Sequence, residues 1–180
     1  MKDHKVELYA TEGLFLGLAK QNLKFHQCVG ELVDNSIASK PEGDKFRIDI
    51  ILLDNKDDSV DVYFIDDCRG MTLDILRKSL QPGDPATTEN RLNEHGFGMK
   101  NSLVTLSGGN GPWRIWTKPI DGDTIFSVEG PFGKDMVIKE GDSFPKNKFL
   151  PADISTLIKV KVKKSFLQFM FLLETGKTYT

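Results

Sequence analysis

Residues 25–38 have the sequence FHQCVGELVDNSIA, and the spacing of their apolar residues predicts an amphipathic helix. One side of this helix is apolar and carries Phe25, Cys28, Val29, Leu32 and Val33. The opposite side carries Glu31, Asp34, Asn35 and Ala38. An ordinary solvated face is one interpretation of these polar residues. The other is a shared site, in which Glu31 orients a water molecule and Asn35, one turn away, offers a carbonyl oxygen to Mg²⁺.

A second candidate site lies where a predicted strand ends, in the sequence from Ile65 to Met71, IDDCRGM. Residues 46–53 and 60–65 are rich in β-branched and large apolar residues, and the polar segment between them predicts a hairpin. Asp66 then falls at the end of the second strand. A buried carboxylate there can accept a hydrogen bond from the amino group of adenine. An ordinary Asp-rich turn is the alternative interpretation.

A third candidate is the glycine-containing segment Gly96-Phe-Gly-Met-Lys100. It follows residues 81–95, which are polar, contain two prolines and predict a long loop. It also opens a predicted helix over residues 99–106, with Lys100 in the first turn. Glycines allow close backbone approach, and the free N–H groups of a helix start attract phosphate. A flexible hinge would have the same pattern.

The remaining segments predict an α+β two-layer sandwich. A short helix with Thr72 as its cap extends to Leu80, and Asp74 lies in its first turn. Strand composition recurs later in the chain, at residues 113–118, 124–129, 135–139 and 156–163.

Overall composition excludes several classes of protein. The chain has 24 basic and 26 acidic residues, so its net charge of -2 does not favour binding to nucleic acid or to an anionic membrane. The lysines of residues 159–164 alternate with valines, as expected of an exposed strand face. Two cysteines, no signal-peptide pattern and no long apolar stretch indicate a soluble, cytoplasmic protein without a membrane span.

In order and spacing, four segments together resemble the nucleotide-site motifs of the GHKL ATPases, named for gyrase, the ninety-kilodalton heat-shock chaperone, histidine kinases and MutL. The segments are residues 31–39, 66–71, 96–102 and 155–160. The resemblance covers residues 14–163 and implies the Bergerat fold, an α/β sandwich with a mixed, mostly antiparallel sheet. The first motif is most similar to those of MutL, gyrase B and the microrchidia ATPases.

The resemblance also implies a role for each matching residue. Glu31 is expected to be the general base, Asn35 the Mg²⁺ ligand and Asp66 the acceptor of the adenine amine. The base pocket is expected to include Gly70 and Met71, and Thr156 is expected to support Asp66 and the base. The ATP-binding residues of the third motif are expected to be Gly96, Phe97, Gly98, Met99 and Lys100, with residues 81–95 as a lid.

The chain departs from the family pattern at four positions. Ala38 replaces an aspartate on the first helix. Glycines are replaced in the later motifs by Cys68, Asn93 and Ser155. None of these changes removes Glu31, Asn35 or Asp66.

The expected function is Mg²⁺-dependent ATP binding and slow hydrolysis, used as a conformational switch that a client protein or a second copy in an ATP-dependent homodimer senses. Two alternatives are a phosphotransferase domain of the histidine-kinase type and a nucleotide-binding scaffold without turnover. Residues 1–180 are expected to form a single domain, either solitary or a fragment that lacks the second domain usual in MutL and gyrase.

Overall fold

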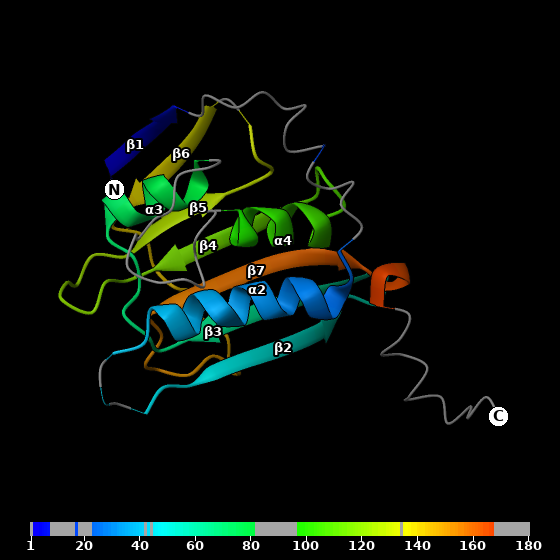
Figure 1. The fold of residues 1–180 in the computed structure, drawn as a ribbon, viewed down its shortest axis with the longest axis horizontal. Helices are drawn as coiled ribbons and strands as arrows, with labels where there is room; N and C mark the ends of the chain where they lie inside the picture. Colours follow the sequence, from blue (N-terminus) through cyan, green and yellow to red (C-terminus); the bar gives the residue numbers. More distant parts are fainter. Residues whose placement is uncertain are drawn as a thin grey trace.

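The computed structural model describes residues 2–7, 17, 23–41, 43, 45–81, 97–133 and 135–167. Within these ranges the strands are β1 (Lys2–Glu7), β2 (Ile48–Asp54), β3 (Ser59–Asp66), β4 (Trp113–Thr117), β5 (Phe126–Glu129), β6 (Asp135–Glu140) and β7 (Thr156–Lys163). The helices are α2 (Phe25–Ala38), α3 (Leu73–Leu80), α4 (Gly98–Leu106) and the 3₁₀ helix η2 (Lys164–Leu167). The strands form one sheet in the order β1-β6-β5-β4-β7-β3-β2 (Figure 1).

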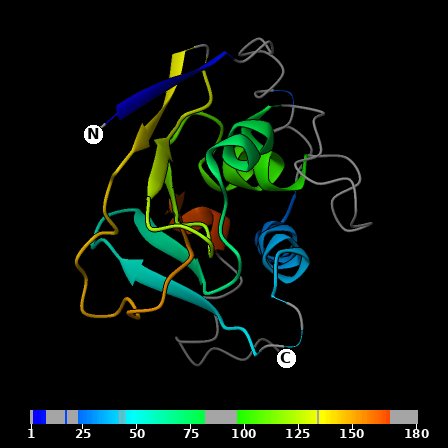
Figure 2. The ribbon, with the colours of Figure 1, turned by 90° about the vertical axis from the view of Figure 1, so that its left-hand side faces the viewer.

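The helices and the sheet form two layers. Helices α2, α3 and α4 cover one face of the sheet, whereas residues 141–155 lie across part of the other face (Figure 2). Every pairing among the described strands is antiparallel. The predicted α+β sandwich with a mostly antiparallel sheet is therefore confirmed, although the parallel pairing that a mixed sheet would contain does not occur within the described strands.

Strand β3 supplies side chains to both faces of the sheet because successive residues of a strand point in opposite directions. Val60, Val62 and Phe64 belong to the main core beneath the helices. Tyr63 and Ile65 belong to a smaller core on the opposite face, where the Tyr63 ring meets Phe149 edge to face at 5.1 Å between centroids. All eight residues of β3 are buried. The end of this strand is therefore held from both sides.

Most predicted elements are confirmed. The bounds of α2 and β7 agree with the prediction, and the hairpin is β2 with β3. The Thr72 side chain caps α3 by accepting a hydrogen bond from the Ile75 N–H at 3.3 Å. In β7 Val160 and Val162 are buried while Lys161 and Lys163 are exposed, which confirms the strand-face interpretation for these two lysines. Lys159 is half-buried and pairs with Asp61, and Lys164 belongs to η2.

The sequence did not predict β1 or η2. The predicted lid lies outside the described residues except for Gln81. No helix within the described ranges is long and apolar enough to cross a membrane.

Candidate functional site

The residues of the second and fourth motifs meet in one row across three adjacent strands. Asp66 in β3 pairs with Thr156 in β7, and Thr156 pairs with Thr117 in β4. Side chains of directly paired residues lie on the same face of a sheet. The structure therefore brings one carboxylate and two hydroxyls together beneath the helices, at the ends of β3 and β4 and the start of β7.

The Asp66 side chain is buried and surrounded by hydrogen-bond donors. Its Oδ2 accepts from the Ser36 hydroxyl at 2.8 Å, and its Oδ1 accepts from the Cys68 N–H at 3.1 Å. Burial raises the pKa of Asp66, whereas hydrogen bonds from Ser36, Cys68 and Thr156 act in the opposite direction. The carboxylate is thus fixed in orientation by side chains and backbone from three elements.

The turn after β3 requires a glycine at position 70. Gly70 has φ +64°, and a Cβ there would lie 2.0 Å from the carbonyl oxygen of Lys118. The next residue, Met71, donates its backbone N–H to the Thr117 hydroxyl at 2.8 Å. This turn is therefore pressed against the end of β4, and the predicted base-pocket residues Gly70 and Met71 lie beside the row that contains Asp66.

The non-glycine residues of the second and fourth motifs fit their positions. Cys68 is fully buried, and burial together with the charges of Asp66 and Asp67 raises the pKa of its thiol to about 12. Ser155 continues the hydrogen-bonded ladder, since its N–H donates to the Asp66 carbonyl and its carbonyl accepts from the Lys118 N–H, each at 2.8 Å. Among the described non-glycine residues only Lys56 has a positive φ, so neither replacement strains the backbone.

Glu31 lies against the first turn of α4. A Cβ added at Gly98 would lie 2.1 Å from Glu31 Oε2, 3.2 Å from its Cδ and 3.6 Å from its Cβ. Glu31 is exposed, so its carboxylate remains accessible to solvent. The first N–H groups of a helix have no acceptors within the helix. The structure thus brings the predicted general base next to the predicted phosphate-binding helix start.

Asn35 lies one turn farther along α2, on the same side as Glu31. Its Nδ2 is buried and has no hydrogen-bond partner within the described part of the chain. No group of three His, Cys, Asp or Glu side chains that could hold a metal occurs among the described residues. Mg²⁺ usually takes only one or two protein ligands together with substrate phosphates and water. Asn35 fits such a limited contribution, because its amide carbonyl is an oxygen ligand and its Nδ2 makes no hydrogen bond to a described residue.

Lys100 has a different environment from the one its motif suggests. Its side chain is 2% exposed, and its Nζ donates to the Ser79 carbonyl at 2.6 Å. Ser79 lies in the last turn of α3, where free carbonyls favour a cation. Phe97 and Met99 are partly buried and pack against the main core. Gly96 lies outside the described residues, so the phosphate contacts remain predictions.

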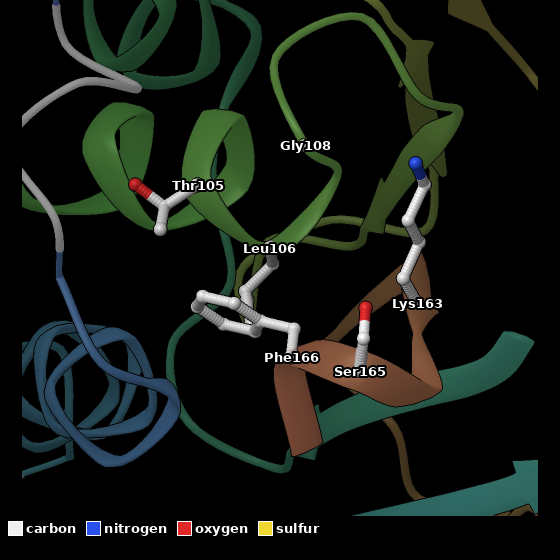
Figure 3. A pocket seen from close by; sticks show the side chains of 6 residues that line it. All are labelled: Thr105, Leu106, Gly108, Lys163, Ser165 and Phe166. Carbon is white, nitrogen blue, oxygen red and sulfur yellow. The ribbon is translucent and has the colours of Figure 1, made fainter. Parts of the chain in front are cut away.

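A shallow pocket lies at the opposite end of β7 from Thr156. It is lined by Thr105, Leu106, Gly108, Lys163, Ser165 and Phe166. Figure 3 shows Phe166 and Lys163 on opposite sides of it, with Ser165 between them. None of the predicted site residues lines this pocket, so it is separate from the candidate site.

Two polar residues of the site were not predicted from the sequence. Ser36 directly follows Asn35 in the first motif, and its position in α2 one turn after Leu32 could have indicated a helix residue near the buried face. No local signal marks Thr117. Its place beside Thr156 depends on the pairing of β4 with β7, which joins segments about 40 residues apart.

The comparison with known families agrees with this geometry. The profile of one family, described as histidine kinase-, DNA gyrase B- and HSP90-like ATPase, matches residues 20–134, which is more than half of the chain. The chain belongs to this family, and it is an ATP-binding domain of the ATPase and kinase class. No curated protein shows significant similarity to it.

Proposed function

We propose that this domain binds ATP with Mg²⁺ and hydrolyses it slowly to ADP and phosphate, and that turnover acts as a conformational switch. The observation that carries the proposal is the position of the Glu31 carboxylate against Gly98, beside the start of α4, where the first N–H groups have no acceptors within the helix. A carboxylate in that position can take a proton from a water molecule that attacks a phosphate bound at the helix start.

The proposed roles fall into two groups, one at each end of a site that extends along α2. At one end of the site Asp66 accepts the adenine amine, Gly70 and Met71 contact the base, and Thr156 supports Asp66. At the other end Glu31 is the general base and Asn35 contributes a ligand to Mg²⁺, which when bound neutralises phosphate charge. The start of α4, with Gly98, binds the phosphates. Among the branches of the family, MutL, gyrase B and the microrchidia ATPases have the most similar first motif.

A histidine-kinase-type phosphotransferase and a scaffold without turnover are the competing functions. Both would retain the adenine site, so Asp66 does not separate them from a hydrolase. Glu31 argues against the scaffold, because a domain without turnover has no use for a carboxylate at the phosphate-binding helix. Against the phosphotransferase stands the first motif, in which Val-Asp-Asn-Ser is more similar to the switch ATPases. An ATP-dependent homodimer or a client protein is the proposed reader of the nucleotide state.

The test combines binding and turnover. Calorimetry should show Mg²⁺-dependent ATP binding, and an assay with γ-labelled ATP should show label released as inorganic phosphate. Glu31→Ala should lower hydrolysis by about 10²-fold or more, the size typical of losing a general base, with little change in ATP affinity. Glu129→Ala, which removes an exposed carboxylate on β5, is the matched control and should hydrolyse at the parent rate.

Three outcomes would contradict the proposal. Label retained on protein would favour the phosphotransferase. ATP binding without turnover would favour the scaffold. Turnover that survives Glu31→Ala would remove the assignment of the general base.

A further inference from the structure

Thr117 is fully buried at the end of β4, and its hydroxyl forms hydrogen bonds with two residues of the site. Its Oγ1 accepts the Met71 N–H at 2.8 Å and lies 3.3 Å from the Thr156 Oγ1. It therefore touches both the turn that contains Gly70 and Met71 and the hydroxyl beside Asp66. No other residue described here links these two parts of the site through its side chain.

The donors and acceptors assign a direction to this set of hydrogen bonds. An ionised Asp66 can only accept, and the Thr156 hydroxyl lies on the same face of the sheet in the residue directly paired with Asp66, so that hydroxyl is oriented to donate to the carboxylate. Thr156 Oγ1 must then accept from the Thr117 hydroxyl. Thr117 can donate in that direction because its oxygen already accepts the Met71 N–H. The chain thus runs from Met71 N–H through Thr117 and Thr156 to Asp66.

We propose that Thr117 is a positioning residue for adenine recognition, a role that rests on the proposed contact between Asp66 and the adenine amine. Its hydroxyl holds the Thr156 proton on Asp66, which keeps the remaining acceptor positions of the carboxylate aimed at the base. The same hydroxyl accepts the Met71 N–H. Thr117 therefore positions both the carboxylate that contacts the adenine amine and the backbone of Met71 in the base pocket. Hydrogen-bonded groups in such a buried chain strengthen one another.

The test uses the isosteric change Thr117→Val, which removes only the hydroxyl. Calorimetry should compare ATP with inosine triphosphate, whose base carries a carbonyl oxygen in place of the amine. We expect Thr117→Val to reduce the preference for ATP over inosine triphosphate by about tenfold, the size of one buried hydrogen bond. Thr117→Ser keeps the hydroxyl and should restore the preference.

Thr105→Val is the matched control. Thr105 is 8% exposed, and its Oγ1 has no hydrogen-bond partner among the described residues. Losing that hydroxyl should leave both nucleotide affinities unchanged. Amide exchange adds a readout that needs no nucleotide, since the Met71 N–H should exchange faster in Thr117→Val than in the parent or in Thr105→Val.

The outcomes separate this inference from the proposed function. If the parent did not prefer ATP over inosine triphosphate, the role of Asp66 would fall, and the role of Thr117 with it. If the parent prefers ATP and Thr117→Val keeps that preference, or lowers the affinities for both nucleotides equally, only the inference about Thr117 is overturned. If Thr117→Val does not fold, Thr117→Ser still tests the inference. Loss of the preference for ATP over inosine triphosphate in Thr117→Ser, which keeps the hydroxyl, would overturn it.

Discussion

The two ends of the candidate site are built differently. At the end that we propose binds adenine (the adenine end), Asp66 is 7% exposed, and the Ser36 hydroxyl and the Cys68 N–H already donate to its carboxylate. At the end that we propose binds the phosphates (the phosphate end), Glu31 is exposed, and Asn35 Nδ2 is buried with no partner among the described residues. Helix α2 contributes to both ends, through Ser36 at one and Glu31 at the other.

This difference indicates which interactions the fold supplies before nucleotide binds. A buried carboxylate with several donors is costly to disturb, so the adenine end is preorganised by interactions that also stabilise the fold. An exposed carboxylate and an uncommitted amide contribute little to folding. Substitutions at the phosphate end should therefore change binding and turnover with little loss of stability, whereas substitutions at the adenine end should affect both.

The largest effect of this kind is expected at Asn35. Asn35→Ala should weaken ATP binding in Mg²⁺ by about 10²-fold and abolish the difference between affinities measured with Mg²⁺ and with EDTA. The free energy of unfolding should change by no more than about 1 kcal/mol, because the Nδ2 atom makes no hydrogen bond to any described residue that the variant would lose. A variant with an intact Mg²⁺ dependence, or with a large loss of stability, would contradict the comparison.

A smaller effect is expected at Gly98. In Gly98→Ala the new methyl group would displace the Glu31 carboxylate, which can move at little cost because it is the end of a flexible side chain. Hydrolysis should fall by about tenfold or more, as expected when a reacting group is displaced. ATP affinity and melting temperature should change little.

Two further variants make the Gly98 prediction specific. Glu31→Asp withdraws the carboxylate by one methylene, so adding it to Gly98→Ala should recover part of the lost rate. Gly30→Ala places a methyl group on α2 where, apart from its chain neighbours and the adjacent backbone of α2, no described atom lies within 4 Å, and it should hydrolyse ATP at the parent rate. If Gly98→Ala instead weakened ATP binding as much as turnover, the role of Gly98 would be to contact the phosphates and not to leave space for the Glu31 carboxylate.

The two ends also differ in how far the sequence predicted them. Glu31 and Asn35 lie one turn apart on a helix, so local periodicity was enough to place them on one side. Asp66 could be placed at the end of a strand, but its partners could not. Thr117 and Thr156 join it through strand pairings between distant segments, and no local pattern specifies those pairings.

Long-range pairing explains the other omissions as well. The sequence of β1, KDHKVE, is too polar to predict a strand, yet it pairs with β6 about 130 residues later. Charged residues are common in edge strands because they discourage further pairing. The contact of the Lys100 side chain could not be predicted from the sequence for the same reason, since only the packing of α3 against α4 places the Ser79 carbonyl at its Nζ.

At the adenine end, Ser36→Ala should have a moderate effect. It removes one donor from the Asp66 carboxylate and should lower ATP affinity by about threefold to tenfold, because the remaining donors still hold the carboxylate. Since the Ser36 hydrogen bond lowers the pKa of Asp66, its loss should raise that pKa further. Ser36→Thr, which keeps the hydroxyl, is the control, and NMR titration of Asp66 measures the shift. An unchanged pKa and affinity would show that Ser36 does not hold the carboxylate.

The smallest expected effect is a pH dependence of stability that distinguishes a buried carboxylate from an exposed one. The pKa of Asp66 is raised above its ordinary value of 3.8 by burial, so the folded state binds this proton more tightly than the unfolded chain does. The resulting stabilisation is fully present below pH 3.8 and is lost as pH rises through the folded-state pKa. Asp66→Asn has no titrating group at this position, so its stability has no such dependence on pH.

The free energies of unfolding of the parent and Asp66→Asn, measured by urea denaturation across this range, should therefore diverge in the variant's favour as pH increases. Asp153 provides the opposite case. A hydrogen bond from Arg47 lowers the pKa of this exposed carboxyl, so its small stabilisation is present above pH 3.8 and is lost as pH falls. Asp153→Asn should accordingly show a weak divergence of the opposite sign. Equal slopes for the two variants would mean that burial of Asp66 does not govern its ionisation, and the adenine end would then lose the feature that distinguishes it from the phosphate end.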